Sequence, residues 1–298
     1  MQLNISATAI NYLNRSNEIA IADKDNVISI YSIETREKTF TYKMILNETN
    51  YIIHIFEIKD NKVLIITKHK SFHLLNRSSL HLELLNLNFS FTILRNTCTM
   101  INDNEVLAIG TNWGNIFIIN INPLIIKSLL LYNILNKNFY FLHMLERSEI
   151  NAIKKIVQYK RGSLLSLSNS KIILWNLSTY QAITVIDIKA SDVTYKLNGE
   201  IMINMNERLW SMNLLLNKKR SVYDSNSKMN KVLEEIKENE YIGIEDNKRI
   251  IKVKDNHREV VEEFNKDIIK YIIGYVNKKN VMILQFEDSV IINYPIQN

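Results

Sequence analysis

The chain has 298 residues, and its 46% hydrophobic and 23% charged residues lie close to the averages of folded globular proteins, which excludes a wholly disordered chain. A net charge of +6 and a pI near 9.1 are compatible with a polyanionic partner, but they are also usual for an ordinary lysine-rich surface. The single cysteine, Cys98, excludes an internal disulfide bond and favours a reducing compartment.

The N-terminal segment and the longest apolar region argue against secretion and membrane insertion. Residues Met1–Asn4 lack the basic and apolar parts of a signal peptide. The apolar region from Leu124 to Leu145 is interrupted by two lysines and three asparagines, too many polar residues for a membrane span. We therefore expect an intracellular protein, in the cytoplasm or the nucleus.

Short apolar runs of β-strand character alternate with polar tight turns along the whole chain. The run Glu18–Ala22 is followed by a polar turn and then by Val27–Tyr31, a pattern typical of a β-hairpin. Such a turn occurs seven times, in chain order at residues 23–26, 67–70, 112–115, 168–170, 206–208, 245–248 and 287–289. Because glycine (6) and proline (2) are scarce, these turns must use Asn, Asp and Ser, which tolerate left-handed backbone angles.

The strand after each turn recurs at a nearly constant interval. Residues near the middle of these strands are separated by 44, 43, 56, 37, 41 and 40 positions, and they are Ile30, Leu74, Phe117, Ile173, Trp210, Ile251 and Ile291. Four-stranded β-propeller blades repeat at about 40–45 residues. The interval predicts an all-β fold, a seven-bladed β-propeller that occupies residues 1–298 as a single domain; a pair of β-sandwiches or a β-solenoid are the alternatives.

The last repeat supplies only three strands, whereas the N-terminus offers a spare one. Residues 268–294 contain the three strands, and Gln2–Ser6 have strand character but precede the first repeat. We expect this segment to pair with the last blade and close the ring, which removes exposed strand edges. The predicted blades cover approximately residues 7–45, 49–88, 90–130, 145–188, 190–224, 229–264, and 266–298 with 1–6.

The fourth repeat carries a family resemblance. It contains Ser163–Ser168, a turn, and then Lys171–Thr179, in which Trp175-Asn176 stands at the place of the terminal Trp-Asp dipeptide of WD40 repeats. Ile30–Thr35 of the first repeat occupies the same place. The chain thus resembles a divergent WD40-repeat protein, which implies a propeller that binds other proteins.

The sequence also departs from the WD40 pattern. No Trp-Asp dipeptide occurs, and no repeat opens with Gly-His. The family's buried Asp–His–Ser/Thr–Trp hydrogen-bond network therefore cannot be assembled, and we expect apolar packing between sheets to replace it. No named subfamily is indicated.

Two stretches are longer than a minimal blade requires. Residues 130–149 contain Phe139, Tyr140 and Phe141, and they are either an insertion with a short helix or an elongated outer strand. Residues 228–240 have apolar residues at helical spacing, but they could equally be the first strand of the sixth blade. Residues 225–228 are expected to form a loop.

The sequence contains no residue pattern for catalysis, metal binding or cofactor binding. His69, His73 and His81 fall in the second repeat with Glu83 as the only acidic neighbour, which does not make a metal site. No glycine-rich phosphate loop is present. We therefore expect no catalytic residue, no cofactor and no small-molecule substrate.

The remaining polar features are basic doublets, mainly at predicted turns, and tryptophans at or beside turns. Basic turns on one face could hold RNA or an acidic peptide, and tryptophan is enriched in interface hot spots. The candidate partner-binding residues are Trp113, Trp210, Lys154, Lys155, Lys218, Lys219 and Arg220.

Three functions follow from these features. The first is a non-enzymatic WD40-like scaffold or adaptor subunit that binds partner proteins within a larger intracellular complex. The second is a propeller associated with RNA or a ribonucleoprotein, for example in ribosome biogenesis. The third is an enzyme that uses the central channel, for which the sequence shows no convergent set of ionisable residues.

Overall fold

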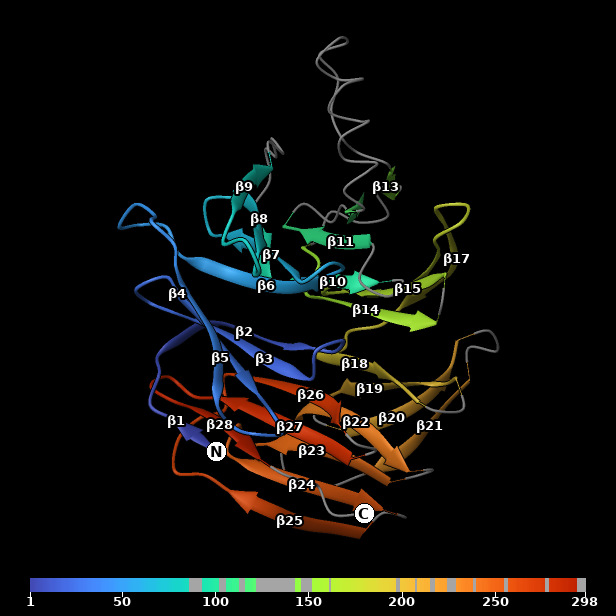
Figure 1. Cartoon of the computed structure of the whole chain (residues 1–298). Helices are drawn as coiled ribbons and strands as arrows, with labels where there is room; N and C mark the ends of the chain where they lie inside the picture. The colour runs from blue at the N-terminus through green and yellow to red at the C-terminus, as the bar shows by residue number, and fades with distance from the viewer. Residues whose placement is uncertain are drawn as a thin grey trace. The chain divides into compact units, whose positions relative to one another are not determined.

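The computed structural model describes residues 1–85, 93–101, 106–112, 116–121, 143–145, 152–160, 162–196, 199–206, 208–214, 218–223, 229–237, 240–254, 257–276 and 279–293. Their regular secondary structure consists of 28 strands, which form seven four-stranded antiparallel sheets (Figure 1). The predicted all-β class and the predicted seven repeats of four strands are confirmed.

The chain divides into two compact units, which we describe separately. Unit 1 comprises residues 1–90 and 267–298, and unit 2 comprises residues 91–266. That residues 1–298 form a single domain stays a prediction.

Unit 1 contains three of the sheets. The first sheet consists of β2 (Ala7–Leu13), β3 (Glu18–Asp23), β4 (Val27–Ser32) and β5 (Lys38–Lys43), in that order. The second consists of β6 (Ile52–Ile58), β7 (Lys62–Thr67), β8 (Phe72–Asn76) and β9 (Leu82–Leu85). The seventh consists of β26 (Lys270–Val276), β27 (Lys279–Gln285), β28 (Val290–Asn293) and β1 (Gln2–Leu3).

Unit 2 contains the other four sheets. The third consists of β10 (Ile93–Ile101), β11 (Val106–Thr111), β12 (Ile116–Asn120) and β13 (His143–Leu145). The fourth consists of β14 (Lys155–Lys160), β15 (Ser163–Leu167), β16 (Lys171–Asn176) and β17 (Gln181–Asp187). The fifth consists of β18 (Asp192–Tyr195), β19 (Ile201–Met205), β20 (Arg208–Asn213) and β21 (Lys218–Tyr223). The sixth consists of β22 (Met229–Lys237), β23 (Glu240–Glu245), β24 (Arg249–Lys254) and β25 (His257–Glu263).

The N-terminal strand completes the last sheet. In β1, Gln2 pairs with Ile291 and Leu3 pairs with Val290 of β28, and Figure 1 shows the dark blue β1 beside β28. Leu3 also packs against an apolar cluster that contains Val290. The predicted pairing of the N-terminal segment with the last blade is therefore confirmed.

In several sheets, burial falls from the inner strands to the fourth strand. Every residue of β6 and β23 is buried, whereas most residues of β17 and β25 are exposed. Strands such as β7 and β23 carry apolar residues on both faces, as strands covered on both faces do. The fourth strand has a solvated edge and tolerates polar residues.

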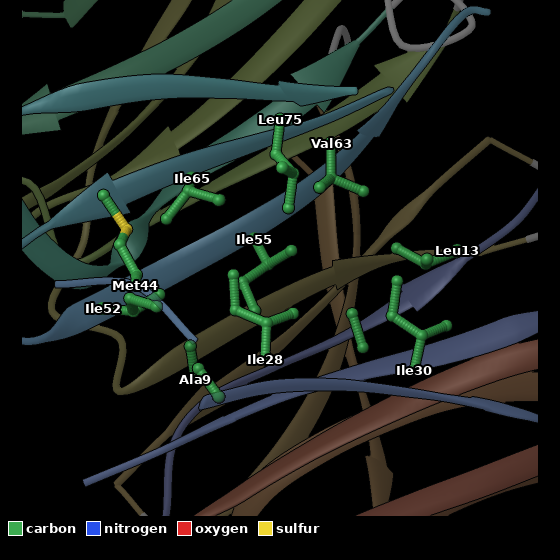
Figure 2. Close-up of a cluster of buried hydrophobic side chains, with 12 residues drawn as sticks. Ala9, Leu13, Ile28, Ile30, Met44, Ile52, Ile55, Val63, Ile65 and Leu75 are labelled. Atoms are coloured by element: carbon green, nitrogen blue, oxygen red, sulfur yellow. The ribbon is translucent and has the colours of Figure 1, made fainter. Parts of the chain in front are cut away.

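Apolar clusters fill the space between neighbouring sheets. Figure 2 shows the cluster between the first and second sheets, where Ile28 and Ile30 of β4 point toward Ile55 of β6 and Val63 of β7. Corresponding clusters join the third to the fourth sheet and the fourth to the fifth. The expected apolar packing between sheets is therefore present.

Turns use asparagine and aspartate where a left-handed backbone is needed. Among the described residues, eleven non-glycine positions have positive φ, and seven of them are Asn or Asp, for example Asn26 (φ 59°) and Asn247 (φ 57°). Their short polar side chains reduce the cost of this conformation. This confirms the turn chemistry expected from the scarcity of glycine and proline.

The structure resolves one of the two long stretches and part of the other. Residues 229–237 form strand β22, so the helical alternative for residues 228–240 is wrong. The backbone of residues 143–145 forms β13, which pairs with β12. Residues 122–142, with the aromatic run, and the expected loop at 225–228 lie outside the described residues.

Candidate functional site

A pocket of about 300 Å³ lies at one end of the first and second sheets of unit 1. It is formed by the turn between β2 and β3, the turn between β6 and β7, and the start of the turn between β8 and β9. Its charged lining consists of Arg15, Glu57, Lys59, Asp60, Lys62 and Arg77.

Local sequence explains the shape of these turns. Asn17, Asp60 and Asn61 have φ angles of 53°, 62° and 55°, and such residues adopt the left-handed region at low cost. The tight turns leave Arg15 and Lys59 exposed on the rim of the pocket.

The carboxylate of Glu57 fixes the turn between β2 and β3 from the neighbouring sheet. Glu57 is buried at the end of β6, and its two oxygens accept hydrogen bonds from the backbone N–H of Arg15 (2.7 Å) and Ser16 (3.1 Å). Hydrogen bonds to an ionised acceptor are stronger than neutral ones. This pair of bonds connects the second sheet to the first.

A buried ion pair lies beside the pocket. The guanidinium of Arg77 donates to both oxygens of Glu18, at 2.7 Å and 3.1 Å, and the side chains are only 12% and 10% exposed. Burial by itself raises the pKa of Glu18, but hydrogen bonds from Arg77, Thr39 and Ser16 outweigh it and hold the pKa below its ordinary value. Glu18 therefore remains a carboxylate.

Hydrogen bonds between two turns of the second sheet fix the remaining wall of the pocket. The side-chain amide of Asn61 donates to Ser78 Oγ at 2.8 Å, and the backbone N–H of Arg77 donates to the carbonyl of Asn61 at 3.0 Å. These bonds hold Asp60 and Asn61 near Arg77. The pocket is thus preformed, with a rim of basic side chains that can bind an anionic group.

Comparison with known proteins identifies the architecture. No protein-family model matches the chain, and no curated protein matches its sequence. A chain in the crystal structure of a mitotic checkpoint complex is similar, with a TM-score of 0.73 and 8% identity over 100% of this chain and 95% of that one. Together with the seven four-stranded sheets, this likeness decides the fold. The chain is a WD40-like β-propeller.

The seven sheets are the blades of this propeller. In all, 1667 chains of solved structures are similar, so the architecture is common and does not by itself single out a function. The expected seven-bladed, divergent WD40-like fold is confirmed.

A buried hydrogen bond joins two strands of the fourth blade. The indole Nε1–H of Trp175 donates to Ser166 Oγ at 2.8 Å, and both residues are buried. This is a single Trp–Ser bond, so the expectation that the complete Asp–His–Ser/Thr–Trp network cannot be assembled is not contradicted. A buried indole N–H needs an acceptor, and Ser166 lies on the adjacent strand.

In two blades, the side chain of an asparagine at the end of the third strand caps the turn that follows. Asn176 Oδ1 accepts from the backbone N–H of Ser178 (2.8 Å) and Thr179 (3.3 Å). Asn76 of the second blade accepts in the same way from Ser78 and Ser79. In both blades this residue caps the turn that follows, and Asn176 stands where WD40 repeats have aspartate.

The candidate residues predicted from the sequence lie at several separate places. Lys154 is exposed just before β14, whereas the Nζ of Lys155 lies 2.5 Å from Asp192 Oδ1. Trp210 is half-buried on β20 and packs against the cluster between the fourth and fifth blades. Trp113 lies outside the described residues.

The basic run expected at a turn lies on a strand instead. The backbones of Lys218, Lys219 and Arg220 belong to β21 and pair with Asn213, Met212 and Ser211 of β20. The structure describes no side chain for these three basic residues.

The three histidines of the second blade are separate. His69 and His81 are exposed, and His73 is half-buried on β8 with its Nε2 3.0 Å from Ser71 Oγ. Within the described ranges, no group of three His, Cys, Asp or Glu side chains could hold a metal ion. Cys98 lies half-buried on β10 and forms no disulfide bond.

The residues of the pocket were not singled out from the sequence. Arg15 and Lys59 belong to turns between the first and second strands of two different blades, 44 positions apart. Their only signal in the sequence is that a basic residue occurs at equivalent places in two successive repeats.

No helix of the described residues has the length and apolar character of a membrane span.

Proposed function

We propose that this propeller is a non-enzymatic scaffold or adaptor subunit that binds partner proteins within a larger intracellular complex. The observation that carries the proposal is the pocket between the first and second blades. Its walls are held by Glu57 and Asn61 before any partner binds. Preorganised surfaces bind more tightly because less conformational entropy is lost on association.

Exposed apolar side chains on outer strands support protein binding. Ile183 and Val185 of β17 are 46% and 48% exposed, and Val260 and Val261 of β25 are 41% and 45% exposed. Pairs of branched side chains beside an open strand edge suit contact with another protein. Trp113, Trp210, Lys154, Lys155, Lys218, Lys219 and Arg220 stay proposed contributors to the partner surface.

The similar solved chain is part of a mitotic checkpoint complex, which is a multi-protein assembly. We propose an assembly role of the same general kind here, with no bound cofactor and no small-molecule substrate. The single cysteine is in keeping with the reducing cytoplasm or nucleus.

A second candidate function is association with RNA or a ribonucleoprotein, for example in ribosome biogenesis. The net charge of +6 and the exposed Arg15, Lys59 and Lys154 favour it. Binding that rests on phosphate contacts weakens steeply with salt, because condensed counterions are released from the nucleic acid.

Salt dependence separates the two functions. The tagged protein is captured from its own cells, and in parallel the purified protein is applied to an RNA column, between about 50 mM and about 200 mM salt. The scaffold function predicts protein partners that remain bound over the whole range. Strong RNA retention that is lost at the higher salt, with no protein partner retained, would favour the second function instead.

A further inference from the structure

Of the strands that the structure describes, β1 is the shortest, and it covers the edge of the last blade (Figure 1). We infer that this edge of β28 is a binding site for an extended segment of a partner protein with apolar side chains at alternate positions. In the resting chain β1 occupies the site as a strap, which must leave before the partner segment binds. This inference rests on the proposed protein-binding function and adds to it the type of partner segment.

The strap is held by a short stretch of backbone. β1 has two residues, which pair with two residues of β28, and Met1 exchanges two backbone hydrogen bonds with Ile292, of 2.7 Å and 2.8 Å. The fourth strands of the other six blades have three to seven residues. Elements with few paired residues and little buried area open locally at low free-energy cost.

A turn at Asn4 allows β1 to leave without disturbing the first blade. The backbone N–H of Ile5 donates to the carbonyl of Leu3 at 3.0 Å, which closes a three-residue turn. The next strand, β2, begins at Ala7 and pairs with β3 in a different sheet. Rotation about the turn would therefore release β1 from β28 and leave the pairing of β2 intact.

The strap itself shows which kind of sequence the edge accepts. Met1, Leu3 and Ile5 are half-buried against the apolar cluster between the seventh and first sheets, whereas Gln2 and Asn4 are exposed. Because successive side chains of an extended segment point to opposite faces, the edge selects apolar residues at every second position. Added strands gain affinity from backbone hydrogen bonds and specificity from these alternate side chains.

Release of the strap would uncover both parts of such a site. Val290 and Ile292 are buried members of the apolar cluster, and Leu3 lies opposite Val290. Without β1 the cluster would lose part of its cover, and the backbone of Ile292 would lose its two bonds to Met1. Exposed apolar area and an open strand edge both favour the addition of another segment.

The site is longer than the strap. β28 has four residues, and β1 together with Met1 pairs with three of them. A partner segment of four or more residues would pair with all of β28, so it would form more backbone hydrogen bonds than the strap that it replaces.

The strap and the partner segment compete for one edge, which makes the inference testable. A ligand that binds only the open form has an apparent affinity reduced by the fraction of open molecules. Substitutions that weaken the strap should therefore tighten binding, and a covalent lock on the strap should prevent it.

Fluorescence anisotropy with a labelled peptide measures this binding on the full-length protein. The probe is Met-Gln-Leu-Asn-Met-Gln-Leu-Asn-Ile-Ser with a C-terminal fluorescein, which repeats the alternation of the strap over ten residues. The control peptide has asparagine at all five apolar positions. We expect the control peptide to bind at least about tenfold more weakly than the probe.

Two double variants of the strap separate its apolar face from its exposed face. The first carries Leu3→Asn with Ile5→Asn, and the matched control carries Gln2→Ser with Asn4→Ser at exposed positions. We expect the first to bind the probe about tenfold more tightly than the wild-type protein, and the control to bind it as the wild-type protein does. Circular dichroism and thermal unfolding check that both variants remain folded.

A reversible lock tests the same site with the apolar face of the strap unchanged. Gln2→Cys with Ile291→Cys, in a Cys98→Ser background, places a disulfide bond across the paired residues of β1 and β28. We expect the oxidised protein to show at least about tenfold weaker binding of the probe than the reduced protein.

Equal binding by the oxidised and reduced proteins would overturn the inference, as would equal binding of the probe and the control peptide. A disulfide-linked dimer from a mixture of the Gln2→Cys and Ile291→Cys single variants would replace the partner segment by the strap of a second copy. If the inference fails while protein partners still survive nuclease treatment, the scaffold function stands without this site.

Discussion

His73 is a half-buried titratable side chain whose charge state depends on folding. Burial lowers its pKa below the ordinary value of about 6.5. Below that pH the unfolded chain takes up a proton that the folded chain resists, so stability is full above about pH 6.5 and falls on acidification. In the folded chain Nε2 lies beside Ser71 Oγ.

We expect His73→Gln to reduce this pH dependence. Glutamine keeps a polar group near Ser71 but does not titrate. The measurement is the free energy of unfolding in urea between about pH 7 and about pH 5.5, where few carboxylates titrate. The wild-type curve should fall more steeply than that of the variant. Parallel curves would mean that His73 is not the group responsible.

Lys196 is a buried cation between two carboxylates in unit 2. Its side chain is 1% exposed, and its Nζ lies 3.4 Å from Glu200 and 3.8 Å from Glu235. The same Nζ lies 5.5 Å from the ring centroid of Tyr241. Glu235 is itself 2% exposed, so the ion pair with Lys196 lies away from water.

We expect Lys196→Met to lower the free energy of unfolding by about 3–5 kcal/mol, because it breaks a buried ion pair by removing one partner. The exposed Lys154→Met is the matched control and should change stability by less than about 0.5 kcal/mol. Urea denaturation measures both. A similar small change in the two variants would show that the buried ion pairs contribute little.

At the scale of the element, neighbouring blades of unit 2 approach closely at Gly110. A Cβ at this position of β11 would lie 2.5 Å from the Cγ2 atom of Ile153, which is closer than atoms in contact can come. Ile153 belongs to the buried cluster between the third and fourth blades. Glycine is therefore required by packing, not by backbone conformation.

We expect Gly110→Ala to destabilise the protein by about 1–3 kcal/mol through overpacking. Ile153→Ala removes the Cγ2 atom that the Cβ of an alanine at position 110 would contact. The double variant should then lose less stability than the sum of the two single variants, as measured by urea denaturation. Additive losses would show that the two residues do not share this contact.

The blades could be predicted from the sequence because their second and third strands are buried. Apolar runs such as Glu18–Ala22 and Val27–Tyr31 flank a polar turn, and five of the seven predicted turns lie between such strands wholly within the described residues. Fourth strands such as β25 are exposed and polar, so they carry little hydrophobic pattern.

The candidate site could not be predicted in the same way. Arg15, Lys59 and Arg77 meet only because two blades lie side by side, a relation that the sequence does not contain. Lys155 stood out as a basic residue, but the structure pairs it with Asp192, 37 positions away. Sequence spacing finds the strands within a blade, whereas the partners of surface charges depend on how blades pack.

At the scale of the whole molecule, the N-terminal strand joins the two ends of the chain in one blade. Met1 and Ile292 exchange two backbone hydrogen bonds, of 2.7 Å and 2.8 Å, so the adjacent Gln2–Ile291 pair is a non-hydrogen-bonded pair with its side chains close together. That geometry permits a disulfide bond.

We expect Gln2→Cys with Ile291→Cys to form a disulfide in the folded protein, in a Cys98→Ser background that removes the native thiol. Mild oxidation should change the mobility on a non-reducing gel and lower the mass by two hydrogens. The control, Asn4→Cys with Ile291→Cys, lies outside the register and should cross-link much less. Equal yields from the two pairs, or an equal yield in urea, would contradict the closure by β1.

The central claim is that this WD40-like propeller works by binding proteins. The most direct measurement is capture of the tagged protein from its own cells with and without nuclease, followed by mass spectrometry of the bound material. The claim predicts a fixed set of proteins that survives nuclease treatment. Loss of all bound proteins on nuclease treatment would contradict it and would make RNA, or an RNA-containing particle, the partner.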